Sequence, residues 1–372
     1  MPGREASRTV RLGVALAWLF CFDFVAGSLL EAIGSNPAWR KPDLDFRVAH
    51  EIYHHDLKPN VDVTARWGNV EYTLRTDDLG FRVAGATSSA SRPSQRRLLV
   101  IGDSFVEGVG LAYEETFVAG LALRLAARGV AVSNAGVVSY SPSIYLRKTR
   151  FLVEERGLVL DAVLVLLDVS DVEDEAVYYR IASDGAITRE GEGSVRDRVF
   201  DLVERNTVLL SSLRTLVRRL REGHAPPRPE DALNRWRALW THDDDAWREY
   251  GESGLALATE RMDALARFLD GRGIRLAIAV HPWPDQIVRG DLESLQVRHW
   301  RAWAAERGAT FIDLFPSFIG DRPAHEVLDA HFIAGDVHWN ARGHALGARA
   351  IGEPLEALWS SPPDAAIDPS AR

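Results

Sequence analysis

The sequence predicts a three-layer α/β/α protein in which a parallel sheet of about five strands lies between helices on both faces. From Arg97 onward, short apolar runs alternate with longer amphipathic segments. The runs at 98–101 and 162–167 are apolar without interruption, as expected of parallel strands that are buried on both faces. Two of the amphipathic segments stop at Gly129 and Gly157, which is typical of helix C-termini.

The expected elements follow this alternation along the chain. Strands are expected at residues 98–101, 130–133, 162–167, 275–280 and 310–313, and helices at 116–128, 143–156, 255–270, 292–307 and 341–359. A β-hairpin is predicted upstream of them, where two strand-like runs flank the turn Gly68-Asn69.

The alternation is interrupted at residues 173–254, where no buried strand is evident. We interpret this stretch as a mostly helical cap insertion in a main domain of residues 96–360. Its best helix, 199–221, has an apolar face and a basic face that either is solvated or lies on an anionic membrane surface. Residues 34–95 are expected to form an N-terminal extension and linker, and residues 361–372 a disordered tail.

Composition excludes some classes of protein. The chain of 372 residues has 44 Lys and Arg against 53 Asp and Glu, a formal net charge of −9, and no segment basic enough for a nucleic-acid groove. Its single cysteine, Cys21, leaves no partner for an intramolecular disulfide bond.

The N-terminus has the pattern of a targeting segment. Three arginines precede an apolar run that continues through residues 12–33 despite Asp23 and Glu31. A membrane span needs about 20 residues, so we expect a signal-anchor at residues 1–33 that leaves the rest of the chain on the exported side of a cell membrane. Cleavage near residues 26–28, giving a secreted protein, is the alternative, and a buried amphipathic helix is a third.

A nucleophile candidate follows the strand at 98–101. Gly102 permits a tight exit from that strand, so the side chain of Ser104 projects from the carboxyl end of the strand. A serine in this position serves either as a helix N-cap or, if a base lies beside it, as a nucleophile.

The sequence Asp336-Val337-His338 contains the groups that would activate such a serine. Residues two apart in an extended loop project to the same side, so Asp336 can orient the imidazole of His338 while its other nitrogen faces Ser104. The alternative is that Asp336 caps the following helix and His338 lies on the surface. No His-Glu-x-x-His pattern supports a metal site with His344, and we expect neither a metal nor a cofactor.

With these residues the chain resembles the SGNH (GDSL-type) hydrolases, which carry four short blocks in fixed order. The blocks are Gly102-Asp103-Ser104, Asn134-Ala135-Gly136, Asp168-Val169-Ser170-Asp171 and Asp336-Val337-His338. The resemblance implies a flavodoxin-like fold, with Ser104 as nucleophile, His338 as base and Asp336 as its partner. It also implies an oxyanion hole formed by the backbone N–H groups of Ser104 and Gly136, with Ser170 in the place of a third donor.

Two departures from the family pattern matter. Ser170 stands where the family usually has an Asn, and a hydroxyl reaches less far than a side-chain amide. The spacing Asp-x-His, followed by Trp339, resembles the exported enzymes that O-acetylate alginate and related polysaccharides. Four further residues are candidates for the substrate pocket, namely Asp103, Asp171, His281 and Trp339.

We therefore predict an exported, membrane-anchored SGNH-type serine esterase or O-acyltransferase that acts on acyl esters, above all O-acetyl groups, of an envelope or extracellular polysaccharide. The same triad serves both reactions, so the sequence leaves esterase and transferase open. Expected partners are a carbohydrate or other acyl ester and a membrane protein that supplies the acyl group, and no nucleic acid. The alternative is a non-catalytic polysaccharide-binding or assembly subunit that retains the fold.

Overall fold

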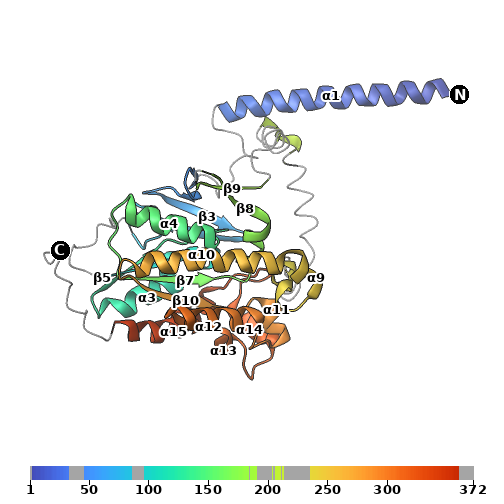
Figure 1. The fold of residues 1–372 in the computed structure, drawn as a ribbon. Coiled ribbons are helices and arrows are strands. Elements are labelled where there is room, and N and C mark those ends of the chain that lie inside the picture. Colours follow the sequence, from blue (N-terminus) through green and yellow to red (C-terminus); the bar gives the residue numbers. More distant parts are fainter. Residues whose placement is uncertain are drawn as a thin grey trace. The chain divides into compact units, whose positions relative to one another are not determined.

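The computed structural model describes residues 2–32, 46–85, 96–183, 185–190, 203, 206–210, 212 and 235–359 (Figure 1). These residues fall into two compact units. One comprises residues 1–45 and 191–226, and the other comprises residues 46–190 and 227–372.

The larger unit is organised around a parallel sheet of five strands. Their order is β11-β10-β7-β5-β6, with bounds β5 (Arg96–Ile101), β6 (Val130–Asn134), β7 (Ala162–Leu167), β10 (Arg275–Val280) and β11 (Thr310–Asp313). All six residues of the central strand β7 are buried. The predicted fold class is confirmed, and the predicted bounds of β7, β10 and β11 agree with the structure.

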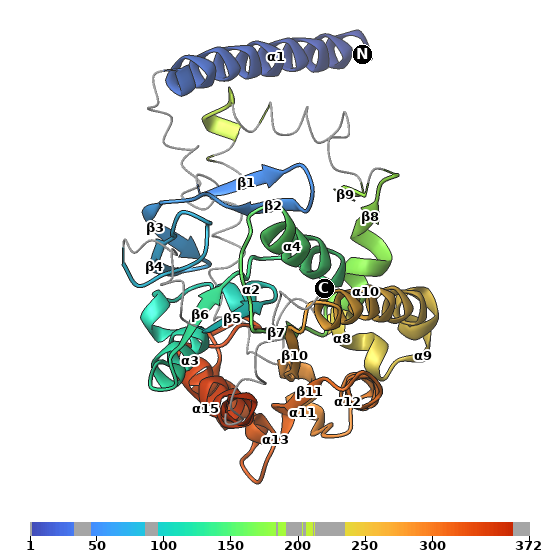
Figure 2. The ribbon, with the colours of Figure 1, turned by 60° about the vertical axis from the view of Figure 1, so that its left-hand side comes forward.

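Five long helices cover the two faces of this sheet. They are α3 (Phe117–Ala126), α4 (Pro142–Glu154), α10 (Glu252–Asp270), α12 (Leu295–Arg307) and α15 (Ala341–Leu358). Helices α4, α10 and α12 lie on one face, and α3 and α15 pack together on the other (Figure 2). This arrangement covers both faces of the sheet, which is why the central strand β7 is apolar and buried along its whole length.

The strand order determines where a site forms. Counted along the chain, the five strands have the order 2-1-3-4-5 of flavodoxin-like sheets. The direction of winding reverses between the neighbouring strands β5 and β7, and ligands bind outside the carboxyl ends of the strands at such a reversal. Ser104 follows β5 and Ser170 follows β7, so both lie at this edge.

Two hairpins precede the sheet and belong to the same compact unit. They are β1 (Arg47–His50) with β2 (His54–Leu57), and β3 (Asp62–Trp67) with β4 (Val70–Arg75). The second is the predicted hairpin, and its turn residue Gly68 has the positive φ of 55° that favours glycine. Thus residues 46–85, expected as part of an extension, pack as part of the main body.

The described part of the insertion consists mostly of short helical segments, as predicted, with one addition. It contains a short antiparallel hairpin, β8 (Tyr179–Ile181) with β9 (Ile187–Arg189), in which only the first residue of each strand is buried. So short and exposed a pair leaves no apolar run in the sequence. Most of the helix expected at 199–221 lies outside the described residues; among those described, 203, 206, 209, 210 and 212 are helical and 207–208 are not. Residues 88–95, at the end of the expected extension and linker, and the tail at 361–372 also lie outside the described residues.

Shorter helical segments complete the larger unit. They are α2 (Ser104–Glu107), α5 (Asp171–Glu173), α8 (Arg235–Ala238), α9 (Asp244–Ala246), α11 (Pro284–Arg289), α13 (Phe315–Phe318), α14 (Ala324–His331), the 3-10 turns Tyr113–Glu115 and Leu239–Thr241, and the π-helical turns Asp174–Tyr178 and Trp247–Gly251.

The smaller unit contains the long helix α1 (Pro2–Ala32), in which the apolar stretch Gly13–Leu30 of 18 residues is long enough to cross a membrane. Asp23 interrupts this stretch, yet its carboxylate is buried and accepts hydrogen bonds from the backbone N–H groups of Val208, Leu209 and Leu210 at 2.8–3.1 Å. An acidic residue is therefore compatible with the apolar helix because the insertion supplies its hydrogen-bond donors.

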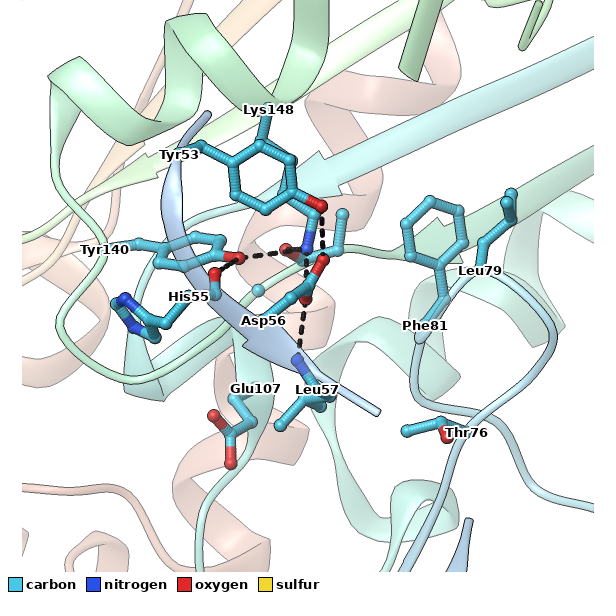
Figure 3. Close-up of polar contacts among 12 residues, drawn as sticks. Tyr53, His55, Asp56, Leu57, Thr76, Leu79, Phe81, Glu107, Tyr140 and Lys148 are labelled. Carbon is cyan, nitrogen blue, oxygen red and sulfur yellow. Dashed lines mark hydrogen bonds and ion pairs between the residues drawn. The ribbon is translucent and has the colours of Figure 1, made fainter. Parts of the chain in front are cut away.

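A fully buried lysine joins the first hairpin to the main body (Figure 3). Lys148 on α4 places its Nζ 2.8 Å from Oδ1 of Asp56 on β2 and 3.2 Å from both the carbonyl of Ala135 and the hydroxyl of Tyr140. The hydroxyl of Tyr53 donates to the other oxygen of Asp56 at 2.7 Å. Burial lowers the pKa of Lys148, and the charge of Asp56 opposes this shift. Every polar atom of the cluster thus has a partner, as low dielectric surroundings require.

Removal of one partner of this buried pair is expected to destabilise the fold strongly. Asp56→Asn leaves the ammonium of Lys148 without its counter-charge and should lower the free energy of unfolding by about 3–5 kcal/mol, measured by urea titration of the full chain in detergent. The control is Asp62→Asn in the exposed pair with Arg75, which should cost no more than about 1 kcal/mol. Equal effects of the two substitutions would contradict the prediction.

Candidate active site

The turn after β5 places Ser104 at the first position of helix α2. Asp103 is the N-cap, and its Oδ1 accepts the backbone N–H of Phe105 at 3.0 Å. Gly102 is required here because a Cβ at this position would lie 2.4 Å from the side chain of Val106 and 3.0 Å from the carbonyl of Leu166. The tight approach of β5, α2 and β7 therefore directs the Ser104 hydroxyl to the carboxyl edge of the sheet.

Ser104, His338 and Asp336 form a continuous hydrogen-bonded chain. Ser104 Oγ lies 2.7 Å from His338 Nε2, and His338 Nδ1 lies 2.6 Å from Asp336 Oδ1. Burial alone would raise the pKa of Asp336, but hydrogen bonds and the charge of His338 lower it to about 2, so this group is a carboxylate at neutral pH. The structure thus brings together the three residues that the sequence nominated as nucleophile, base and orienting acid.

The loop that bears the base is held by backbone hydrogen bonds. Ile333 N–H donates to the carbonyl of His338 at 2.9 Å, and Asp336 N–H donates to the carbonyl of Ile333 at 3.0 Å. The ring of Phe105, next to the nucleophile, packs 4.9 Å from the imidazole of His338. The imidazole is therefore held on both its loop side and its nucleophile side.

Trp67 is a site residue that the sequence reasoning missed. It ends β3, and its indole Nε1–H donates to Asp336 Oδ2 at 2.7 Å, while its ring meets the His338 ring edge-on at 4.9 Å. The only sequence signal was an aromatic residue next to the predicted hairpin turn. That signal does not report which surface a hairpin 269 residues away from Asp336 will contact.

Two of the three expected oxyanion donors are engaged elsewhere. The N–H of Gly136 donates to Oδ1 of Asn134 at 3.1 Å. The backbone N–H of Ser170 donates to Asp168 at 2.7 Å, and its hydroxyl also hydrogen-bonds to that carboxylate. The expected donation by Gly136 and Ser170 to an oxyanion would therefore compete with these hydrogen bonds. Ser104 differs, because the N–H of a first helical residue has no acceptor within its helix.

Below the nucleophile lies a layer of buried carboxyl groups. Asp168 accepts from Trp283 Nε1 at 2.7 Å and lies 3.1 Å from His281 Nε2. Burial opposes its ionisation, but the hydrogen bond and charge of His281 and the hydrogen bonds of Ser170 lower the pKa of Asp168 to about 2. The pKa of Asp171 is shifted in the opposite direction. Burial and the neighbouring charges of Asp168 and Asp103 raise its pKa well above the ordinary value, and the hydroxyl of Tyr145 lies 3.1 Å from each of its oxygens.

The candidate pocket residues need correction on these grounds. His281 and Trp339 are both fully buried, and Trp339 stacks on Phe318 with ring centroids 5.1 Å apart. Asp171 is buried beneath the site and also accepts the N–H of Asp168. The burial of these three side chains counts against their expected place in the substrate pocket. Asp103 alone contacts the nucleophile, with its Oδ2 3.3 Å from Ser104 Oγ.

An ion pair joins the nucleophile helix to the first hairpin. Glu107, the last residue of α2, is fully buried and accepts two hydrogen bonds from Arg47 at 2.8 and 2.6 Å. The same carboxylate accepts the N–H of Val138, in the loop after β6, at 2.8 Å. Burial alone would raise the pKa of Glu107, but Arg47 lowers it below its ordinary value. Glu107 thus holds three segments around the nucleophile.

Within the described ranges, no group of three or more His, Cys, Asp or Glu side chains is arranged to hold a metal ion.

The structure thus places a serine hydroxyl, an imidazole and a carboxylate in one hydrogen-bonded chain at the carboxyl edge of a flavodoxin-like sheet. No family model matches the chain, and no curated protein matches it. Among solved structures, TesA is 16% identical with a TM-score of 0.41 over 71% of this chain and 99% of its own. An acetylxylan esterase from Geobacillus stearothermophilus is 14% identical, with a TM-score of 0.39 over 72% and 97%. At these values we argue the function from the side chains alone.

Asp336→Asn is expected to lower the rate of the Ser104-dependent reaction by about 10⁴-fold, because an amide cannot hold the imidazole in the same tautomer. The reaction of Ser104 with an active-site-directed phosphonate, followed over time, measures this effect. Asp329→Asn, an exposed residue on the nearby helix α14, serves as the control and should leave the rate unchanged. A normal rate in Asp336→Asn would contradict the assigned role.

The raised pKa of Asp171 predicts a pH-dependent stability. The folded chain binds this proton more tightly than the unfolded chain, so the stabilisation is complete below the ordinary value of 3.8 and is lost as pH rises through the folded pKa. Asp171→Asn has no proton to lose. It should therefore reduce the fall in unfolding free energy between about pH 4 and pH 8, measured by urea titration. Exposed Asp270→Asn should not change that slope. If the unfolding free energy fell equally with pH in the wild type, Asp171→Asn and Asp270→Asn, the argument would be contradicted.

Proposed function

We propose that this protein is an SGNH-type serine enzyme that cleaves or transfers acyl esters. The observation that carries the proposal is the hydrogen-bonded chain from Ser104 through His338 to Asp336, with distances of 2.7 and 2.6 Å. A serine hydroxyl is a weak nucleophile unless a base within hydrogen-bond reach removes its proton, and the base needs a third group to fix its tautomer. Each of those roles has one residue here.

The reaction follows from this geometry. His338 Nε2 accepts the proton of Ser104 as Oγ bonds to the ester carbonyl carbon, and the Ser104 N–H faces the developing oxyanion. Collapse breaks the bond to the alcohol, which leaves with the proton from His338. The acyl group is then on Ser104. His338 next deprotonates water or a sugar hydroxyl, whose attack releases an acid or a new ester and restores Ser104.

The backbone N–H groups of Gly136 and Ser170 are hydrogen-bonded to other residues, which limits the rate of ester turnover that we expect. Loss of one oxyanion donor costs about 2.7–4 kcal/mol of transition-state stabilisation. The N–H of Gly136 joins the oxyanion hole only if it releases Asn134, and Ser170 only if it releases Asp168. We therefore expect slow turnover of simple esters relative to the rate at which reactive phosphonates phosphonylate Ser104 Oγ.

We place the reaction on the exported side of a membrane, on O-acetyl groups of an envelope or extracellular polysaccharide. The apolar stretch of α1 supports an anchor or a signal peptide, and the three arginines before it support a cytoplasmic amino terminus. The sequence Asp336-Val337-His338-Trp339 supports the polysaccharide O-acetylation type. A membrane protein would supply the acyl group if the reaction is a transfer.

A second candidate is a non-catalytic polysaccharide-binding subunit that retains the fold. The observation in its favour is the hydrogen bonding of Ser170 and Gly136 to Asp168 and Asn134, which leaves few free donors for an oxyanion.

The full chain in detergent should react with a serine-directed phosphonate at Ser104 and hydrolyse a small acetyl ester. Ser104→Ala should lose both, with activity falling by at least about 10³-fold, whereas the exposed Ser253→Ala should retain both. Intact mass and peptide mapping locate the label. A wild-type chain that neither reacts nor turns over would favour the binding subunit and would overturn the enzymatic proposal.

Esterase and transferase are separated by the acceptor. The acetylated enzyme is incubated with water alone or with de-acetylated polysaccharide fragments, and mass spectrometry reads acetate release against acetyl gain on the glycan. A gain on the glycan that requires Ser104 establishes transfer, whereas acetate release at the same rate with and without glycan establishes hydrolysis.

A further inference from the structure

The hairpin of β3 and β4 makes a direct contact with the triad. Trp67 lies at its end, half-buried, and its indole N–H donates to the oxygen of Asp336 that does not face His338. We propose that Trp67 is a positioning residue of the triad, acting through Asp336. This inference rests on the proposed function, because it assigns a partner to the orienting acid of the same site.

Asp336 needs such a partner. Its side chain is 24% exposed and sits in a turn, where a carboxylate can rotate toward water. Oδ1 accepts from His338 at both Nδ1 and the backbone N–H, at 2.6 and 3.2 Å. With Trp67 on Oδ2, both oxygens have fixed donors on opposite sides. The plane of the carboxylate is then set, and with it the direction in which His338 Nε2 faces Ser104.

The indole of Trp67 lies beside the loop after α2. The Cβ and Cδ1 atoms of Trp67 lie 3.8 and 3.9 Å from the position that a Cβ on Gly110 would occupy, which is ordinary contact distance. On its other side the indole meets the edge of the His338 ring. Trp67 is thus enclosed between the nucleophile loop and the base loop.

The hairpin is also tied to the nucleophile helix. The buried guanidinium of Arg82 donates to the carbonyl of Thr73 on β4 and to those of Glu107, Gly108 and Leu111 around the end of α2. The first hairpin is tied in the same way by the Lys148 and Asp56 cluster (Figure 3). Trp67 therefore moves with the helix that carries Ser104, and it couples that helix to Asp336.

The test is Trp67→Phe, which keeps an aromatic ring and removes the N–H. The matched control is Trp303→Phe, because Trp303 Nε1 also donates to a carboxylate, Asp263, at 2.8 Å, but between α12 and α10. In the full chain in detergent, Trp67→Phe should lower two rates by about 10- to 100-fold: kcat for hydrolysis of a small acetyl ester, and the rate of phosphonate labelling of Ser104. The KM for the ester should be nearly unchanged. Trp303→Phe should leave these values unaltered.

A double-mutant cycle and a spectroscopic signal separate positioning from packing. In the Asp336→Asn background, Trp67→Phe should have no further effect on labelling, because its action passes through Asp336. The low-field proton resonance of the His338 Nδ1–H should be present in the wild type and in Trp303→Phe, and shifted or lost in Trp67→Phe. Additive effects in the cycle, or an unchanged resonance, would overturn the inference.

The outcomes also distinguish this inference from the proposed function. If the wild type does not react at Ser104, the proposed function fails. The His338 Nδ1–H resonance, compared between the wild type and Trp67→Phe, then still tests whether Trp67 orders the pair of Asp336 and His338. If the wild type reacts and Trp67→Phe reacts equally fast, the inference on Trp67 fails while the proposed function stands.

Discussion

The hydrogen bond between Ser104 Oγ and His338 Nε2 is the constraint on which the rest of the site depends. It requires two loops, 234 residues apart in the chain, to meet at 2.7 Å. The parallel sheet makes this possible, because it brings the carboxyl ends of its strands to one edge. The close turn at Gly102 aims the serine, and the backbone-bonded loop at 333–338 aims the histidine.

Buried charge explains how the segment before the sheet is held in place. Arg47, Arg82 and Lys148 each make hydrogen bonds that join residues 46–85 to the body around α2 and α4. A buried charge without a partner is strongly destabilising, so each of these contacts tolerates little displacement. Exposed ion pairs contribute little to stability, so they would not hold the segment in place in the same way. Residues 46–85 therefore form one structural unit with the sheet and not a loosely attached extension.

Much of the fold follows from the sequence, because a strand that is buried on both faces, such as β7, leaves a continuous apolar run in the sequence. The triad was also predictable from the sequence, since Ser104 follows a predicted strand and Asp336 and His338 precede a predicted helix. Trp67 was not, because its role comes from a tertiary contact with no local pattern. His281 and Trp339 were misplaced in a pocket, since position after a strand does not reveal whether a side chain points outward or into the core.

The order of the site along the chain has a consequence for folding. Trp67, Ser104 and His338 come from three distant parts of the sequence, so their contacts close long loops, whose entropic cost slows folding. Until α15 and the loop before it have docked, Ser104 has neither its base nor its orienting acid. A partly folded chain therefore carries an inert hydroxyl, and the reactive nucleophile appears only when the sheet is complete.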